Sequence, residues 1–252
     1  MMAASDGRPA ASIQIDLIDP DAMELWRTVA DVATALGEDR KWCLIGGLMV
    51  ALFAIEAQQT QRVTTDIDVL ADARARPSAT EWASRRLESL GATLHQVQGL
   101  ERERGFRFDV HGQIVDVLAP EGLGPAGART TGGLQTIQIP GGTQALRRTE
   151  VVEIVVGDTA ARLRRPTLIA AILLKARALR IHSRPEDQRH DLVTLLSLLE
   201  DPRAAREEIT SKELAWLRSI CDRLAINHPG PEASLDAAHL RAARAAFALL
   251  TA

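Results

Sequence analysis

The sequence predicts an α+β fold in which a mixed β-sheet domain with flanking helices is followed by a C-terminal helical domain. Three observations lead to this prediction. Short runs rich in Val and Ile recur up to about residue 165 and are typical of strands. Longer amphipathic segments interrupt these runs and place helices beside the sheet. From Pro166 onward only helical patterns remain. We therefore expect a sheet domain over residues 1–165 and a helical domain over residues 166–252.

The composition is that of a globular protein. The chain has 252 residues, of which 46% are hydrophobic, and this is enough to form a proper core. Acidic residues number 33 and basic residues 30, so the net charge of −3 gives no overall basic field for a nucleic-acid partner. The absence of tyrosine and an aromatic content of 3% argue against a surface on which bases stack.

The sequence contains no segment that predicts export or membrane insertion. Residues 1–11 are small and polar, and no apolar run reaches the length of a membrane-spanning helix. Cys43 and Cys221 lie far apart without metal-ligand spacing, so we expect reduced thiols rather than a disulfide. Cytoplasmic location without membrane contact is the expectation.

The first elements form a strand, a pair of glycines and a helix. A helix is expected to begin at Asp19-Pro20-Asp21 and to run through about Gly37, and the apolar run Trp42–Ile45 predicts a buried strand. Gly46 and Gly47 follow, before a second helix. Glycines at such a junction let the backbone approach a ligand, and the helix N-terminus offers N–H groups to a phosphate. A tight turn that packs a helix on a strand explains the same pair equally well.

Two carboxylates in the next strand are the main candidates for chemistry. In the segment 62–70, Asp66 and Asp68 are two positions apart and therefore lie on one face of the strand. Their Cα atoms are expected about 6.6 Å apart, so both side chains can reach one divalent cation. Aspartate is rare in strands, and a departure from local propensity is typical of a functional site. Taken alone, the pair also fits an edge strand with a solvated face.

A third carboxylate comes from a predicted hairpin. His111-Gly112 joins the strand 106–110 to the strand 113–118. Asp116 lies in the more continuous apolar run, so we prefer it as the third carboxylate of a metal cluster. Asp109, in the preceding strand, is the alternative.

The rest of the sheet domain is predicted from alternation and turn residues. Further elements are a helix from Ser78 to Leu90, strands at 93–97, 135–139, 151–156 and 161–163, a turn at Gly157-Asp158, and a Gly-rich loop over 121–134. The loop is interpreted as a connector, with the border of a substrate cleft as the alternative.

The helical domain is expected to contain four helices, at 166–182, 185–200, 211–226 and 234–250. Lys175 interrupts an apolar surface of the first of these helices. It either extends along the helix to solvent or has a function inside the protein. Asp187 and Asp191 are four positions apart on the second helix and share one face.

In combination, these motifs resemble the nucleotidyltransferase superfamily related to DNA polymerase beta. The shared pattern is a strand that ends in Gly46-Gly47, the Asp66-Ile67-Asp68 strand, and a later strand with one embedded aspartate. The run Arg62–Asp68 and the segment from Lys175 to Leu192 look like the AbiEii and MenT group of bacterial toxin nucleotidyltransferases. The resemblance covers about residues 40–200. Two departures are a long interval between Gly47 and Asp66, and Gly47 in place of the serine of many members.

The resemblance implies a nucleotidyltransferase fold and a reaction. One or two Mg²⁺ ions would be held by Asp66, Asp68 and Asp116, and Asp116 would also help to deprotonate the acceptor hydroxyl. The nucleoside triphosphate would be bound by Gly46, Gly47, Thr65, Lys175 and Asp191. Lys175 would stabilise the departing pyrophosphate, and Asp191 would lie at the rim of the cleft.

The acceptor is not specified by the metal-binding residues, which serve all acceptors alike. The resemblance implies a tRNA 3′ end and a toxin with a cognate antitoxin. The alternatives are nucleotidylation of a small molecule such as an antibiotic, or of a protein. A non-catalytic nucleotide-binding or regulatory protein is the third class.

Overall fold

The structure is a computed structural model of the full chain, and it describes residues 12–39, 41–60, 62–95, 104–124, 127–179, 185–220 and 237–252. It has an α+β fold with two sheets. The larger sheet has the strand order β2-β3-β6-β5-β4, with β7 paired to β6. Its strands are β2 (Trp42–Ile45), β3 (Asp66–Ala71), β4 (Thr93–Leu94), β5 (Arg107–Val110), β6 (Gln113–Pro120) and β7 (Gln138–Ile139). The smaller sheet consists of β1 (Ser12–Ile15), β8 (Thr149–Val156) and β9 (Thr159–Pro166), in the order β1-β8-β9.

The register of the central strands in the larger sheet decides which of their charged residues are neighbours. Strand β3 pairs with β2 in antiparallel and with β6 in parallel orientation, so the sheet is mixed as predicted. In this register Asp68 lies opposite Asp116. The hairpin of β5 and β6 then places Arg107 opposite Asp116 on the other side. Three charged residues therefore lie side by side across three neighbouring strands.

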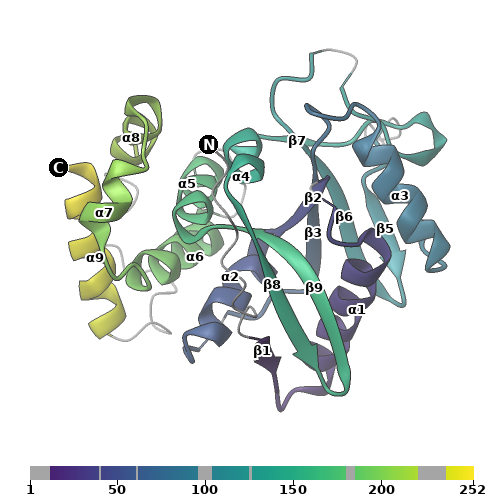
Figure 1. Ribbon diagram of the computed structural model, residues 1–252, viewed down its shortest axis with the longest axis horizontal. Helices are drawn as coiled ribbons and strands as arrows, with labels where there is room; N and C mark the ends of the chain where they lie inside the picture. The colour runs from purple at the N-terminus through teal and green to yellow at the C-terminus, as the bar shows by residue number, and fades with distance from the viewer. Residues whose placement is uncertain are drawn as a thin grey trace, which may run out of the picture.

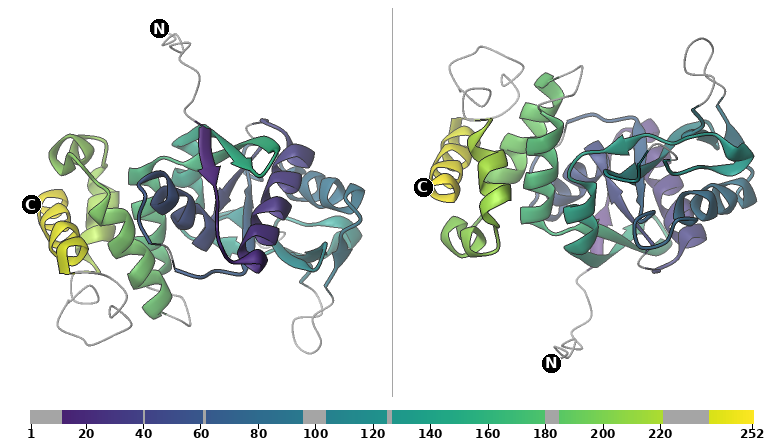
Figure 2. Two further views of the ribbon diagram at one scale, coloured as in Figure 1. Left: turned by 90° about the horizontal axis from the view of Figure 1, so that it is seen from below. Right: turned by 90° about the horizontal axis from the view of Figure 1, so that it is seen from above.

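The helices surround the sheets, as Figure 1 shows. They are α1 (Pro20–Leu36), α2 (Gly46–Glu56), α3 (Ala79–Ser89), α4 (Gly142–Arg147), α5 (Leu168–Ala178), α6 (Pro185–Ser197), α7 (Pro202–Glu207), α8 (Ser211–Arg218) and α9 (Ala237–Thr251). Helices α5 to α9 gather at one end of the molecule, and the views in Figure 2 agree on this. Helix α2 packs between β3 and α6 and so connects the sheet to this helical group. Among the described residues, every helix is too short or too polar to cross a bilayer.

Several predicted elements are confirmed. Helix α1 begins after Asp19, whose side chain accepts a hydrogen bond from the backbone N–H of Asp21, and it ends at Gly37. The β8–β9 hairpin turns at Gly157-Asp158 as expected. The His111-Gly112 turn is also present, with positive φ angles of 55° and 80°.

Other predictions are corrected by the structure. Pro166 does not start a helix, because it is the last residue of β9 and pairs with Thr149; Thr167 then precedes α5. Strand β1 was not predicted at all. The short helices α4 and α7 were also missed. The strand expected at 93–97 is described only as Thr93–Leu94, and its last two residues lie outside the described residues.

The C-terminal helices are described only in part. Helix α8 ends at Arg218, earlier than predicted, and Cys221 lies outside the described residues. Cys43 is buried in β2, where burial raises the pKa of its thiol, so it is a core thiol as expected. The division at residues 165 and 166 stays a prediction.

One ion pair ties the β-rich part to the C-terminal helices. Arg148, between α4 and β8, binds both carboxylate oxygens of Glu213 on α8, at 2.7 and 3.0 Å. The same carboxylate caps α8 by accepting the backbone N–H of Thr210 at 2.9 Å. Burial opposes ionisation, but the bonds from Arg148 and Thr210 hold the pKa of Glu213 below its ordinary value.

We therefore expect Glu213→Gln to destabilise the protein at neutral pH. A carboxyl group whose folded pKa is depressed stabilises above its unfolded pKa, and this contribution is lost as the pH falls through the folded value. The free energy of unfolding should drop by roughly 1–2 kcal/mol at pH 7, and the gap to wild type should close under acid conditions. Urea unfolding at several pH values measures it, with exposed Glu207→Gln as the control. An equal loss at all pH values would contradict this account.

Candidate functional site

The turn between β2 and α2 is adapted to one neighbour, the side chain of Asp68. Gly46 has a φ of 73°, and a Cβ atom there would overlap Oδ2 of Asp68 and lie 2.7 Å from its Cγ. The β2–β3 register, which pairs Ile45 with Asp68, creates this close approach. The glycine predicted to bring the backbone near a ligand thus first brings it near the candidate metal-binding carboxylate.

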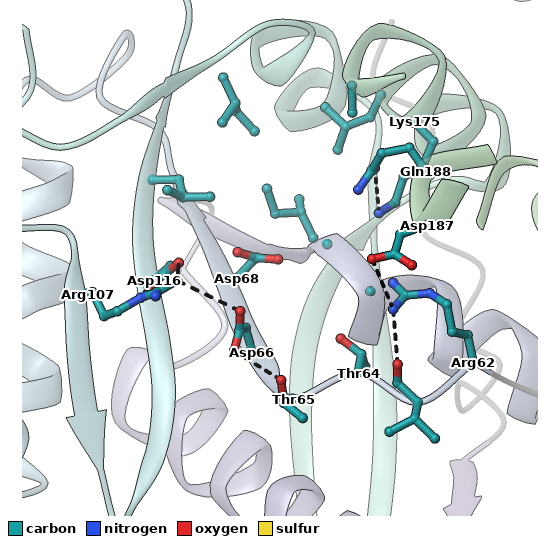
Figure 3. A pocket seen from close by; sticks show the side chains of 18 of the residues that line it. Arg62, Thr64, Thr65, Asp66, Asp68, Arg107, Asp116, Lys175, Asp187 and Gln188 are labelled. Atoms are coloured by element: carbon teal, nitrogen blue, oxygen red, sulfur yellow. Dashed lines mark hydrogen bonds and ion pairs between the residues drawn. The ribbon is translucent and has the colours of Figure 1, made fainter. Parts of the chain in front are cut away.

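The three candidate carboxylates line one cavity of about 530 Å³. Figure 3 shows Asp66, Asp68 and Asp116 along one wall, with Arg107 next to Asp116. Asp66 is 40% exposed at its side chain and Asp116 only 8%. Asp66 and Asp68 line the same cavity, as expected for two residues on one face of β3.

Negative charge is crowded on this carboxylate wall. Burial, followed by repulsion from Asp116, raises the pKa of Asp68 to about 7. Burial also raises the pKa of Asp116, while hydrogen bonds from Arg107 oppose that rise. A bound cation would relieve the repulsion, so the chemistry of these oxygen donors fits a hard divalent ion.

The donor set supports two carboxylate ligands more directly than three. Within the described ranges, no group of three or more His, Cys, Asp or Glu side chains is arranged to hold a metal ion. Asp116 shares the cavity, but both of its oxygens accept hydrogen bonds from Arg107, at 2.9 and 2.8 Å. If a Mg²⁺ ion binds here, Asp66 and Asp68 would be the residues to hold it.

The opposite wall of the cavity carries two cations, Lys175 and Arg62, together with the carboxylate of Asp187. Figure 3 shows Lys175, Gln188, Asp187 and Arg62 facing the carboxylate wall. Lys175 is buried, with its Nζ atom 2.8 Å from Oδ2 of Asp191 and 3.3 Å from Oε1 of Gln188. Lys175 therefore does not extend along its helix to solvent. It is held inside the protein at the edge of the cavity.

Asp191 lies behind this wall and not among the residues that line the cavity. It also accepts hydrogen bonds from Nε and Nη2 of Arg62, at 3.1 and 3.3 Å. Burial opposes its ionisation, but Lys175 and Arg62 hold the pKa of Asp191 below its ordinary value. The expected place of Asp191 at the cleft rim is thus corrected: its carboxylate fixes the two cations that do face the cavity.

The missing serine at position 47 is explained by Thr64. A Cβ atom at Gly47 would overlap Oγ1 of Thr64 and lie 2.9 Å from its Cβ and 3.2 Å from Nη2 of Arg62. The side chain of Thr64 therefore fills the space that a residue-47 side chain would take. Its hydroxyl lines the cavity beside the N-terminus of α2.

Other predicted residues have clear positions. Thr65 lines the cavity, and its hydroxyl donates to Oδ1 of Asp66 at 3.3 Å. Asp109, the alternative third carboxylate, instead accepts the backbone N–H of Gly112 in the hairpin turn. The described part of the 121–134 loop is absent from the cavity lining, which favours the connector interpretation.

Three features of the site were not predicted from the sequence: Arg107, Thr64 and the pairing of Arg62 with Asp191. A signal for Arg107 was present. A two-residue turn at 111–112 pairs Val110 with Gln113, and the same register carries Arg107 to Asp116. No comparable signal existed for Arg62, whose partner Asp191 is 129 residues away.

Comparisons with known proteins give a weak likeness. No family model and no curated protein matches the chain. A solution structure of the antibiotic-resistance factor ANT(2'')-Ia matches with 13% identity over 83% of this chain and 96% of that chain, at a TM-score of 0.41. The crystal structure of ANT(2'')-Ia in complex with adenylyl-2''-tobramycin matches with 14% identity over 81% and 99%, also at 0.41. An antigenic nucleotidyltransferase-like protein from Paracoccidioides brasiliensis matches with 10% identity over 79% and 88%, at 0.46. These values are too low to carry an activity or a substrate over to this chain.

Gly46→Ala should abolish divalent-ion binding while the chain stays folded. The new methyl group must displace the Asp68 carboxylate, and the positive φ adds about 1 kcal/mol of strain. Gly112→Ala is the matched control, because its φ is 80° and nothing lies within 4 Å of an added Cβ. Mn²⁺ binding followed by electron paramagnetic resonance measures the difference. Equal binding by both variants would refute the role given to the Gly46–Asp68 contact.

Asp68→Asn should stabilise the metal-free protein above pH 7. With a folded pKa of about 7 and an ordinary value of 3.8, wild-type stability falls as the pH rises between these values. At pH 8 the variant should gain up to about 4 kcal/mol, and at pH 4 the two proteins should be nearly equal. Thermal unfolding in chelator measures the gain, with exposed Asp158→Asn as the control. A gain that does not depend on pH would count against the raised pKa of Asp68 as its cause.

Proposed function

We propose that this chain is a Mg²⁺-dependent nucleotidyltransferase, which moves a nucleoside monophosphate from a nucleoside triphosphate to an acceptor hydroxyl. The observation that carries the proposal is the two-walled cavity. The carboxylates of Asp66 and Asp68 face Lys175 and Arg62 across the cavity. Its volume of about 530 Å³ is within the usual range for a small-molecule site. One wall suits a cation and the other suits phosphate oxygens.

The carboxylate wall would hold the metal. Asp66 and Asp68 are the proposed ligands, and a bound Mg²⁺ would supply neutralisation of triphosphate charge and orientation for in-line attack. As the acceptor oxygen bonds to the α-phosphorus, the bond from that phosphorus to the β-phosphate oxygen breaks, and pyrophosphate leaves with the electron pair. The acceptor proton would pass to Asp116 or to water.

The other residues would position the triphosphate. Gly46 and Gly47 form the start of α2, which has no side-chain cap, so backbone N–H groups are available to phosphate oxygens. The hydroxyl of Thr64 supports the same role beside them. Thr65 lines the cavity, where its hydroxyl donates a hydrogen bond to Asp66. Lys175 and Arg62 would stabilise the departing pyrophosphate, and Asp191 would keep both cations in place.

A tRNA 3′ end is the acceptor that we propose, on the resemblance described above. A second cavity of about 370 Å³ adjoins the first, since both are lined by Arg62, Val63 and Thr64. This second cavity would give room for part of an acceptor. A small hydroxylated molecule, such as an antibiotic, or a protein side chain would use the same metal site. A cytoplasmic toxin with a cognate antitoxin is the biological setting that the resemblance implies.

The activity is tested by incubating the protein with Mg²⁺, each α-labelled nucleoside triphosphate in turn, and total bacterial tRNA. We expect label in RNA with wild type and none with Asp66→Asn/Asp68→Asn. Asp72→Asn/Asp109→Asn is the matched control: it removes two carboxylates near the same strands that do not line the cavity.

The pattern of labelling separates the alternatives. Label in an added aminoglycoside or in protein, with unlabelled RNA, would replace the tRNA acceptor and keep the reaction. Triphosphate binding without pyrophosphate release would favour a nucleotide-binding or regulatory protein. Neither binding nor turnover would refute the proposed function.

A further inference from the structure

The guanidinium of Arg107 occupies a special place in the carboxylate wall. From β5 its Nε and Nη2 atoms donate to Oδ1 and Oδ2 of Asp116, at 2.9 and 2.8 Å. The same Nη2 atom lies 3.8 Å from Oδ2 of Asp66. Bidentate pairs of this kind, between a guanidinium and a carboxylate, are among the strongest hydrogen-bonded ion pairs in proteins. The bonds to Asp116 raise the pKa of Arg107, so its positive charge is permanent.

The pairing removes Asp116 from the set of free metal ligands. To ligate an ion, Asp116 would have to release one or both charge-assisted hydrogen bonds and leave a partly buried guanidinium without its partner. Loss of such a partner is strongly unfavourable. A second ion beside Asp116 would also come close to the guanidinium, and like charges repel.

The charges of the wall balance with a single divalent ion. Three carboxylates and one guanidinium leave two negative charges, which one Mg²⁺ ion neutralises. On the opposite wall, Lys175 and Arg62 are already paired with Asp191 and Asp187, at contacts between 2.8 and 4.0 Å. Without a triphosphate in the cavity, two divalent ions would leave the carboxylate wall with an excess of positive charge.

We propose that Arg107 takes the place of a second metal ion, so that this site works with one divalent cation held by Asp66 and Asp68. The proposal rests on the proposed function, since it specifies the charge that accompanies nucleotidyl transfer. Arg107 is 35% exposed at its side chain and lines the cavity, so its free edge is available to a phosphate oxygen or to the acceptor. The β5–β6 hairpin fixes its position before any ligand binds.

The number of bound ions tests this role. Mn²⁺ is titrated into the full chain with and without a non-hydrolysable α,β-methylene triphosphate, and the free ion is measured by electron paramagnetic resonance, with analogue alone as the blank. We expect one protein-bound ion in wild type and two in Arg107→Gln, because Asp116 becomes free. Arg107→Gln/Asp116→Asn should return to one. Arg85→Gln, on the surface of α3, is the matched control and should stay at one.

Each result supports or overturns the proposal. Two ions in wild type, or no additional ion in a folded Arg107→Gln protein, would overturn it. If Arg107→Gln does not fold, the spectrum of Mn²⁺ bound to wild type decides: an isolated six-line signal supports the proposal and an exchange-coupled pair overturns it. Label transfer that depends on two ions would refute the role of Arg107 alone, whereas the absence of both ion binding and transfer would refute the proposed function.

Discussion

The cavity depends on one buried carboxylate, that of Asp191. It is only 2% exposed and accepts hydrogen bonds from Lys175 of α5 and from Arg62, which precedes β3. The sheet and the helical group are thereby joined at the point where both contribute to the cavity. A buried charge that loses its partner destabilises a protein by about 3–5 kcal/mol. The Asp191 carboxylate therefore holds Lys175 and Arg62 in the cavity wall and also helps to attach the helices to the sheet.

The carboxylate wall on the other side of the cavity lowers the stability of the folded protein, because its negative charges repel one another. Asp68 and Asp116 lie side by side in the β3–β6 register, and Asp66 stands on the same face of β3 as Asp68. Arg107, on the neighbouring strand β5, offsets part of their mutual repulsion. Local rules for strands would place apolar or uncharged side chains here. Such a violation is typical of a site kept for function, with the stability supplied by the apolar core around it.

Local patterns were enough to predict the succession of strand, glycine pair and helix that begins the site, and the turn of the β5–β6 hairpin. Alternation in β3 identified Asp66 and Asp68, and the glycines marked the start of α2. Long-range contacts were beyond such patterns: Arg62 meets Asp191 only after the helices fold back on the sheet. Pro166 was misplaced because a proline fits the end of an edge strand as well as the start of a helix. The register of the hairpin could have revealed Arg107 before the structure did.

The parallel pairing of β1 with β8 has a consequence for biosynthesis. Ile13 and Ile15 are buried in the finished fold, yet their partners Ile154 and Val156 are made much later. At rates of synthesis of about 5–20 residues per second, the first strand waits on the order of ten seconds for its neighbour. During that interval an apolar segment with unpaired backbone groups is attached to the ribosome. Until β8 has been made, the exposed β1 segment can pair wrongly with other strands or be bound by a chaperone.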